Sequence, residues 1–493
     1  MNGTFSSLNQ TNTANTTEIA AMAIWHMMQA FFGSFPQYNP GNSTLSTVGV
    51  NLFAESYGGK YGPAFAALWD KQNKKRLNGT ISTSGSLAIK LVSLGIINGC
   101  IDDLVQAPYY PVMAVNNTYG LTAINPTRAS LANASFYASG GCQDLINQCR
   151  DAVAVHDPTN SGDVSTVNSI CGNAQSFCTN NVMDPYSDAG RSYYDISHLL
   201  PDSFPPSTYL EYVNSESFLA AIGSPINYTE TDPQVVAAFT STGDYERESF
   251  VPAIASLLND GIRVGLIYGD RDYICNWIGG EAISISVAAA ASGSYFGEFT
   301  AAGYAPIIVN SSYIGGVVRE YGNLSFSRIY DAGHMVPAYQ PETAFQVFYR
   351  IITGTSVSTG EIVDLSVYNS SGPAIASQTN SLPPSPSNTC WIRNIPGSCT
   401  DEQKNLIIDN QGVIINGVLY DAASDYGGGS SSMQGGSETM VPTGTYTTVT
   451  EVLTGAYTAT ATPSQNGVTS GRKLNSLLLG SICLGASLLL FAI

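Results

Sequence analysis

The sequence predicts an α/β fold with a mostly parallel central sheet. Three segments support this prediction, because each begins as an apolar strand pattern and ends in a reactive side chain. Residues 48–56 end in Ser56, and a good helix opening follows at residues 64–69. Residues 263–272 end in acidic residues, and residues 326–334 end in His334. Buried strands that alternate with helices are typical of a parallel sheet.

The turn after the first of these strands resembles a nucleophile elbow. Tyr57, Gly58 and Gly59 follow Ser56. Glycine suits such a turn because the turn brings backbones so close together that no room is left for Cβ atoms. The general pattern is G-x-S-x-G, and this chain has Ala54 at the first small position. Taken alone, the turn is also compatible with a purely structural role. Serine, acid and histidine nevertheless follow one another in the chain order of an α/β-hydrolase.

The remaining elements are predicted in chain order from periodicity and breakers. A helix is expected from Glu18 to Phe32, and a second one follows the elbow to about Gln72. The neighbouring parallel strand lies within residues 87–99, after which strand and helix alternation is lost between about residues 104 and 228. Further helices are expected at 206–222, 247–259 and 341–352, the segment 280–314 is mixed, and a hairpin is expected within 406–420.

The cysteines indicate an oxidising compartment and a stapled insertion. Four of the nine lie between residues 142 and 178, and their spacing suggests two disulfides, although sequence alone allows three connectivities: Cys142, Cys149, Cys171 and Cys178. A metal site is the rival interpretation, but no histidine accompanies the four. Cys390 and Cys399 can close a short disulfide loop. We expect no cofactor and no metal.

Composition excludes nucleic acid as a partner. The net charge is −18, with 19 basic and 37 acidic residues among 493, so little is available to neutralise phosphates. Eleven Asn-x-Ser/Thr sequons favour a secreted glycoprotein at the cell surface, outside the cell or in a vacuole. They begin at Asn2, Asn9, Asn15, Asn42, Asn78, Asn116, Asn133, Asn227, Asn310, Asn323 and Asn369.

Domain boundaries follow from shifts in composition. Residues 1–17 are predicted to be a disordered stub, residues 18–353 the catalytic domain, residues 354–423 an extension, and residues 424–472 a Gly/Ser/Thr-rich stalk. Residues 473–493 form an apolar tail, either a transmembrane helix or, with Asn466 or Gly467 as attachment site, the signal for a GPI anchor. Residues 1–9 are no signal peptide, so we expect that the sequence begins inside a longer protein.

Three motifs resemble the active-site signatures of the serine carboxypeptidase family. They are the segments 55–61 (ESYGGKY), 269–277 (GDRDYICNW) and 332–337 (AGHMVP). The resemblance runs from about residue 19 to residue 353. It implies an α/β-hydrolase fold and a peptidase that removes C-terminal residues from peptides. It also implies the nested disulfides Cys142–Cys178 and Cys149–Cys171 in a lid insertion.

The three motifs supply candidate catalytic residues. A serine hydroxyl needs a base, and His334 is the candidate base for Ser56. Resemblance selects Asp272 as the residue that orients His334, whereas Asp270 is expected to cap or orient the turn. The backbone N–H of Tyr57 is expected to be an oxyanion-hole donor, and the Tyr57 side chain can simply pack.

Glu55 points to a carboxypeptidase rather than an esterase. A protonated Glu55 can donate a hydrogen bond to the α-carboxylate of a peptide, whereas an ionised Glu55 would repel it. The structural alternative is a carboxylate that only braces the elbow. Resemblance places Cys275 and Met335 in the wall of the substrate site.

One family feature is missing from the sequence. The second oxyanion donor and the carboxyl partner of Glu55 lie, in the family, in an Asn-Gly-Gly-Pro-Gly loop upstream of the elbow, and no such loop precedes Ser56 here. Loss of one oxyanion donor costs about 10² to 10³ in rate. We therefore expect either that a longer product supplies this loop or that the chain is an inactive, hydrolase-like surface protein. Acyl transfer on the same scaffold is a third possibility.

Overall fold

The computed structural model describes residues 12–38, 49–202, 204–385, 389–392, 395–415 and 417–425. Its main sheet has six strands in the order β1-β2-β3-β6-β5-β4. The first four of these are parallel to one another, and β5 pairs antiparallel with both β6 and β4. The strands are β1 (Val50–Glu55), β2 (Leu91–Ile97), β3 (Arg263–Gly269), β4 (Ala305–Asn310), β5 (Tyr313–Tyr321) and β6 (Leu324–Ile329). The predicted α/β fold with a mostly parallel sheet is confirmed.

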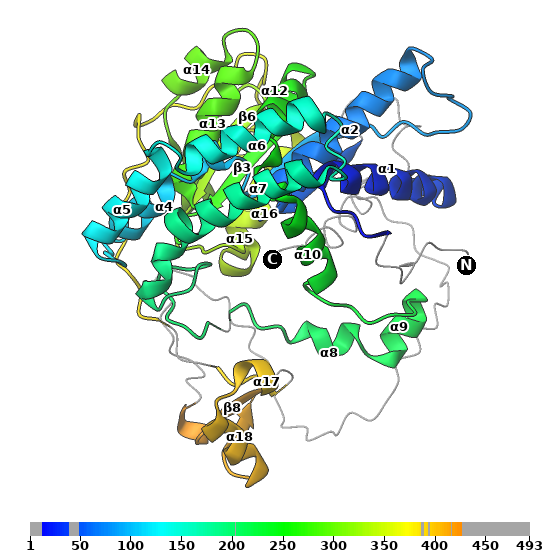
Figure 1. The fold of residues 1–493 in the computed structure, drawn as a ribbon. Helices are drawn as coiled ribbons and strands as arrows, with labels where there is room; N and C mark the ends of the chain where they lie inside the picture. Colours follow the sequence, from blue (N-terminus) through cyan, green and yellow to red (C-terminus); the bar gives the residue numbers. More distant parts are fainter. Residues whose placement is uncertain are drawn as a thin grey trace, which may run out of the picture.

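Helices cover both faces of this sheet (Figure 1). One face carries α2 (Gly58–Leu77), α12 (Val251–Asn259) and α13 (Trp277–Ala290), and the other carries α16 (Pro341–Thr353). Two buried apolar clusters separate these layers, with Trp69 and Phe326 on the first side and Val347 on the second. The strands of a parallel sheet are apolar along their whole length because both faces are covered, and β3 and β6 are buried throughout.

The first helix, α1 (Thr17–Ser34), packs on α2. Residues 1–17 were predicted to be a disordered stub, but Thr16 and Thr17 form the beginning of this helix. Thr16 caps the helix, because its side chain accepts a hydrogen bond from the N–H of Ile19. The N–H and hydroxyl of Thr17 donate to the carboxylate of Asp244 at 2.7 and 2.6 Å. Residues 1–11 lie outside the described residues.

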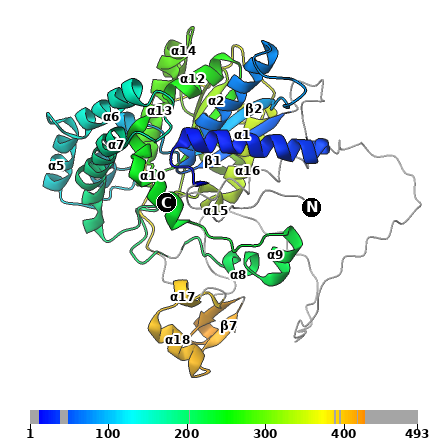
Figure 2. The ribbon, with the colours of Figure 1, turned by 45° about the vertical axis from the view of Figure 1, so that its right-hand side comes forward.

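The predicted lid insertion consists of helices (Figure 2). They are α3 (Asp103–Gln106), α4 (Tyr109–Val115), α5 (Pro126–Tyr137), α6 (Cys142–His156), α7 (Ser165–Cys178), α8 (Tyr209–Val213) and α9 (Glu216–Ile222), followed by α10 (Pro233–Thr242) and α11 (Asp244–Arg247). Two disulfides, Cys142–Cys178 and Cys149–Cys171, tie α6 to α7 in the nested arrangement. The single helix expected at 206–222 is two helices, because Ser215 caps a new one.

Shorter elements complete the described chain. The mixed segment contains α14 (Tyr295–Ala301) and β4, and α15 (Val336–Tyr339) follows the histidine loop. Short 3-10 and π turns are η2 (Pro36–Tyr38), η4 (Thr179–Met183), η5 (Asp184–Ala189) and η7 (Ala423–Asp425).

The C-terminal extension has a small unit of its own. A disulfide joins Cys390 to Cys399 beside α17 (Ile395–Ser398) and α18 (Asp401–Ile408). The predicted hairpin is β7 (Val413–Ile415) with β8 (Val418–Tyr420), and α18 occupies the start of the range expected to be hairpin. The predicted tail, and the stalk beyond residue 425, lie outside the described residues. Within the described ranges, no helix is both long and apolar enough to cross a membrane.

Candidate active site

Ser56 lies on a tight turn between β1 and α2. Its φ angle is +63°, a left-handed conformation that is uncommon for a residue with a side chain. The N–H of Ser56 donates to the carbonyl oxygen of Ile97 at 3.0 Å, and its own carbonyl accepts from the N–H of Cys100 at 3.1 Å. A Cβ atom on Gly59 would lie 2.7 Å from the Cys100 carbonyl oxygen. Glycine is therefore required where the elbow touches the end of β2.

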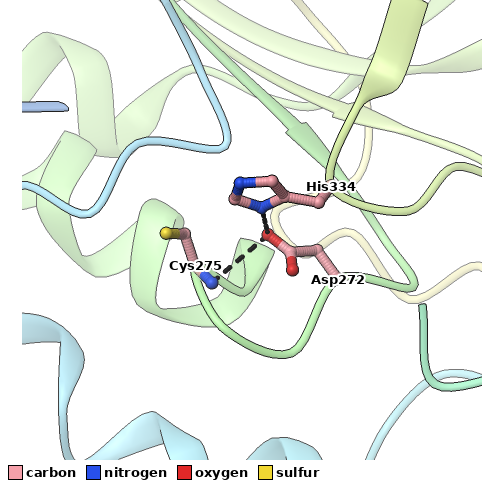
Figure 3. Close-up of side chains that lie close together, drawn as sticks. All are labelled: Asp272, Cys275 and His334. Atoms are coloured by element: carbon pink, nitrogen blue, oxygen red, sulfur yellow. Dashed lines mark hydrogen bonds and ion pairs between the residues drawn. The ribbon is translucent and has the colours of Figure 1, made fainter. Parts of the chain in front are cut away.

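The predicted acid and histidine form a hydrogen-bonded pair (Figure 3). The loops after β3 and β6 bring them together, and His334 Nδ1 lies 2.8 Å from Asp272 Oδ2. Both side chains are buried. Among the described residues, Nε2 of His334 has no hydrogen-bond partner, and so the Ser56 hydroxyl does not bond to it here. In unliganded enzymes such a bond is often long or poorly aligned.

Asp272 is held by several donors. Its Oδ2 accepts from the side-chain amide of Asn98 at 2.8 Å and from the N–H of Cys275 at 3.2 Å, and its Oδ1 accepts from the N–H of Ile274 at 3.1 Å. Such donors stabilise the ionised form of a carboxyl group. They also fix the carboxylate that orients the imidazole.

Cys275, expected in the wall of the substrate site, also takes part in a disulfide that the sequence did not predict. Cys275 is bonded to Cys100, so the end of β2 is joined covalently to the acid loop. The sulfur of Cys275 lies close to Asp272 and His334, but a disulfide sulfur is not the thiolate that a metal needs. Met335 is half-buried next to His334 in the chain.

Asp270 has a different set of partners from Asp272. It forms a buried ion pair with Arg328 at 3.0 Å, accepts from the Tyr119 hydroxyl at 2.6 Å and accepts from the N–H of Asp331 at 3.0 Å. Burial raises the pKa of Asp270 to about 6. The residue braces the turn that leads to the histidine loop, and it does not contact His334.

Electrostatics couple Glu55 to the pair. Glu55 keeps some exposure to solvent, yet burial and, to a smaller extent, the charge of Asp272 raise its pKa to about 7, although His334 acts in the opposite direction. Burial alone would lower the pKa of His334, but Asp272 and Glu55 raise it above its usual value. Glu55 is therefore neutral at acid pH.

The Tyr57 side chain is bonded rather than merely packed. Its hydroxyl donates to Asp244 Oδ2 at 2.5 Å, the carboxylate that also holds the start of α1. Its ring lies 6.0 Å from the ring of Phe239 and 5.8 Å from that of Tyr245, and all three line a cavity of about 120 Å³. The backbone N–H of Tyr57 lies at the start of α2, the positive end of that helix.

Two features of the site were missed by the sequence analysis. Asn98 falls at the end of the range predicted for the second strand, and the sequence predicts no disulfide for Cys100. The dipeptide Asn98-Gly99 directly after a strand pattern is a turn signal, and it marks the place where the chain leaves the sheet. No local pattern links Cys100 to Cys275, because 175 residues separate them.

Comparisons with known proteins show which proteins this chain is similar to. A family model described as serine carboxypeptidase matches residues 2–354. The chain is 44% identical over 432 residues to Carboxypeptidase S1 homolog B of Arthroderma otae, which covers 86% of this chain and 64% of that protein. It is 42% identical over 435 residues to Carboxypeptidase S1 homolog A of Trichophyton rubrum, with 86% and 65% covered.

One further curated protein and one solved structure are also similar. Carboxypeptidase S1 of Penicillium janthinellum is 34% identical over 350 residues, with 71% of this chain and 75% of that protein covered. The structure of Kex1(delta)p, a prohormone-processing carboxypeptidase from Saccharomyces cerevisiae, matches with a TM-score of 0.47 and 18% identity, over 71% of this chain and 69% of that one. The chain spans less than two thirds of the length of the first two relatives. By its family match and its 34% identity to the Penicillium protein, the chain belongs to the serine carboxypeptidase family.

Proposed function

We propose that this protein is a serine-type carboxypeptidase that removes C-terminal residues from peptides through an acyl-enzyme and works best at acid pH. One observation supports it most directly. A buried His334–Asp272 pair leaves Nε2 of the imidazole unbonded within the described residues, at the strand ends where the Ser56 elbow also lies. A free Nε2 on an oriented imidazole is what a general base for a serine hydroxyl requires.

In the proposed reaction, Nε2 of His334 takes the proton of the Ser56 hydroxyl while the serine oxygen attacks the last peptide carbonyl. The negative oxygen is stabilised by the N–H of Tyr57. The imidazolium then gives its proton to the departing amine, and the peptide bond breaks. Water, deprotonated in turn by His334, attacks the acyl carbon, the bond to the Ser56 oxygen breaks, and the imidazolium returns its proton to that oxygen. Asp272 stabilises the imidazolium in both halves.

Glu55 accounts for selectivity toward a free C-terminus. Its carboxyl group adjoins the nucleophile, and its pKa of about 7 keeps it neutral in acid. The neutral group donates a hydrogen bond to the substrate α-carboxylate, whereas the ionised group repels it. The acid preference follows from this residue, since the substrate end stays ionised at the same pH.

Substitution of the nucleophile tests the proposal. Ser56→Ala in the full-length protein should abolish release of C-terminal residues from blocked dipeptides, and a fluorophosphonate probe should label the wild type but not the variant. Retained hydrolysis in Ser56→Ala would overturn the assignment. A folded wild type that neither cleaves nor reacts with the probe would favour the inactive surface protein instead.

We also propose that a longer form of the protein supplies the second oxyanion donor and a carboxyl partner for Glu55. Within the described residues β1 is an edge strand of the sheet, and an unpaired edge favours pairing with a further strand. Expression with and without upstream coding sequence, followed by probe labelling, tests this. Equal labelling of the two forms would contradict it.

The proposed compartment is the secretory pathway, with attachment to a membrane through residues 473–493. Four disulfides and exposed sequons, Asn78 and Asn310 among them, support it. Release of the protein from cells by a phosphatidylinositol-specific phospholipase would identify a GPI anchor. Resistance to the phospholipase together with extraction only by detergent would identify a spanning tail.

A further inference from the structure

Asn98 lies at the centre of the site without being one of its reacting groups. It follows β2 directly and is fully buried, and its φ angle is +40°. Its N–H donates to the Ile267 carbonyl at 2.8 Å, which continues the pairing with β3. Asparagine is one of the few residues with a side chain that tolerate this conformation. The backbone therefore turns at this position and sends the amide toward the acid loop.

The orientation of the Asn98 amide is fixed by its partners. Its Oδ1 accepts from the N–H of Gly269 at 2.9 Å, and a backbone N–H can only donate. The other end of the amide must then be the NH₂ group, which lies 2.8 Å from Asp272 Oδ2. An amide flip would place a donor against a donor and an oxygen against a carboxylate. Asn98 therefore clamps both ends of the loop from Gly269 to Asp272.

The oxygen that Asn98 contacts is the one that faces the imidazole. Oδ2 of Asp272 accepts from Asn98 and is bonded to Nδ1 of His334, both at 2.8 Å. Each extra donor withdraws negative charge from this oxygen, which weakens its stabilisation of the imidazolium. The other ionisable groups near His334 are Glu55 and the Tyr194 phenol, whose ring centre lies 5.0 Å from the imidazole.

We propose that Asn98 is a positioning residue that sets the basicity of His334 through Asp272. The inference rests on the proposed function, because it concerns the base of that reaction. The amide holds Asp272 in line with the imidazole and keeps its charge partly neutralised. Loss of the amide leaves more negative charge on Oδ2, which then holds the imidazolium more strongly. More of the enzyme is then protonated at His334, and inactive, at acid pH.

The alternative is that Asn98 serves the backbone turn alone. Under that interpretation glycine, which adopts positive φ readily, should be a benign replacement. Asn160 provides a matched control, because it is also buried and has a φ angle of +52°. Its amide donates to the carboxylate of Glu248 at 3.2 Å, and neither partner belongs to the proposed machinery.

The experiment compares Asn98→Gly, Asn98→Asp and Asn160→Gly with the wild type. The readouts are kcat/KM for an ester of a blocked amino acid and the rate of fluorophosphonate labelling, both between pH 4 and 8. An ester has no α-carboxylate, so Glu55 binding does not enter. Asn98→Gly should lower kcat/KM about 10- to 100-fold, since a hydrogen bond to a charged group is lost. Its acid limb should move up by about half a pH unit to one unit.

The other variants keep the inference testable if Asn98→Gly does not fold. Asn98→Asp preserves the shape of the side chain, and two carboxyl groups about 3 Å apart share one proton. Its protonated carboxyl should therefore donate to Asp272 in place of the amide and keep the acid limb close to that of the wild type. Asn160→Gly should leave the acid limb in place. An unmoved acid limb in Asn98→Gly with activity lowered equally at all pH values, or a shifted acid limb in Asn98→Asp, would overturn the inference while hydrolysis by the wild type stands. A wild type without hydrolysis or labelling would instead overturn the proposed function.

Discussion

Glu55→Gln is the substitution that most directly separates a carboxypeptidase from a general esterase. The change keeps the size of the side chain and a hydrogen-bond donor but removes the ionisation that burial places at about pH 7. In the wild type, the Michaelis constant for peptides with a free C-terminus should rise as Glu55 ionises. In the variant, the same constant should stay flat from acid to neutral pH.

The magnitude follows from the charge that appears. Two carboxylates about 4 Å apart repel by about 4 kcal/mol at an effective dielectric constant of about 20, so the ionised enzyme scarcely binds the substrate. Only the neutral fraction then counts, and it falls about tenfold for each pH unit above the pKa. At pH 8 the wild-type KM should be about tenfold its acid value. At pH 5 the variant should bind within about fivefold of wild type, because an amide donor replaces a carboxyl donor.

The assay measures KM between pH 4.5 and 8.5 for a blocked dipeptide acid and for the corresponding ester. Only the acid substrate should show the rise near neutral pH. Glu18→Gln is a matched control, because burial also raises the pKa of Glu18 to about 7 but the residue lies at the start of α1. A rise that persists in Glu55→Gln, or that disappears in Glu18→Gln, would refute the assignment of Glu55 to the substrate carboxylate.

Three further predictions concern the scaffold. Replacing Cys100 and Cys275 by alanine should cost about 2 to 5 kcal/mol in urea unfolding and lower kcat, and unchanged values would contradict the view that the bond holds the acid loop. The folded state should be more stable at pH 4.5 than at 7.5 by at least about 2 kcal/mol, because the pKa values of the buried Asp103 and Asp270 are raised to about 6. Protonation of these two carboxyl groups then favours the folded state, and stability is lost as pH rises. Calorimetry that finds the protein more stable at pH 7.5 than at 4.5 would exclude this explanation. Asp244→Asn should lower unfolding free energy by about 1 to 3 kcal/mol and speed hydrogen exchange at the start of α1, whereas unchanged exchange would show that this carboxylate is dispensable.

The elements that the sequence predicted best are those with local chemistry. A strand followed by Ser56 and two glycines predicts an elbow. The structure shows why glycine is needed there, because the backbone of Gly59 lies against Cys100. Helix α16 has a proline in its first turn and a left-handed Gly354 at its end, which are helix boundary signals. The fold class could be predicted from such segments, because the local sequence of each one indicates its secondary structure.

The parts that could not be predicted depend on the register between segments that lie far apart in the sequence. Asn98 reaches Asp272 only because β2 lies between β1 and β3, with its last residue, Ile97, paired to Glu55 and to Ile267. Cys100 meets Cys275 for the same reason. The helix α18 is a different case, because its capping box of Thr400 and Gln403 is a local signal that the predicted hairpin overlooked. The register between strands that are distant in the sequence has no such local signal.

The proposed activity depends on two pKa values that work against each other. Peptide binding needs a protonated Glu55, whose pKa is about 7, while attack needs a neutral His334, whose pKa is raised by Asp272. A carboxylate without other donors would raise the pKa of His334 further and leave few molecules in the active protonation state. The donors from Asn98 and the Cys275 backbone to Oδ2 limit that rise. A peptide acid should therefore show a narrow bell-shaped pH profile, while an ester should show the acid limb alone.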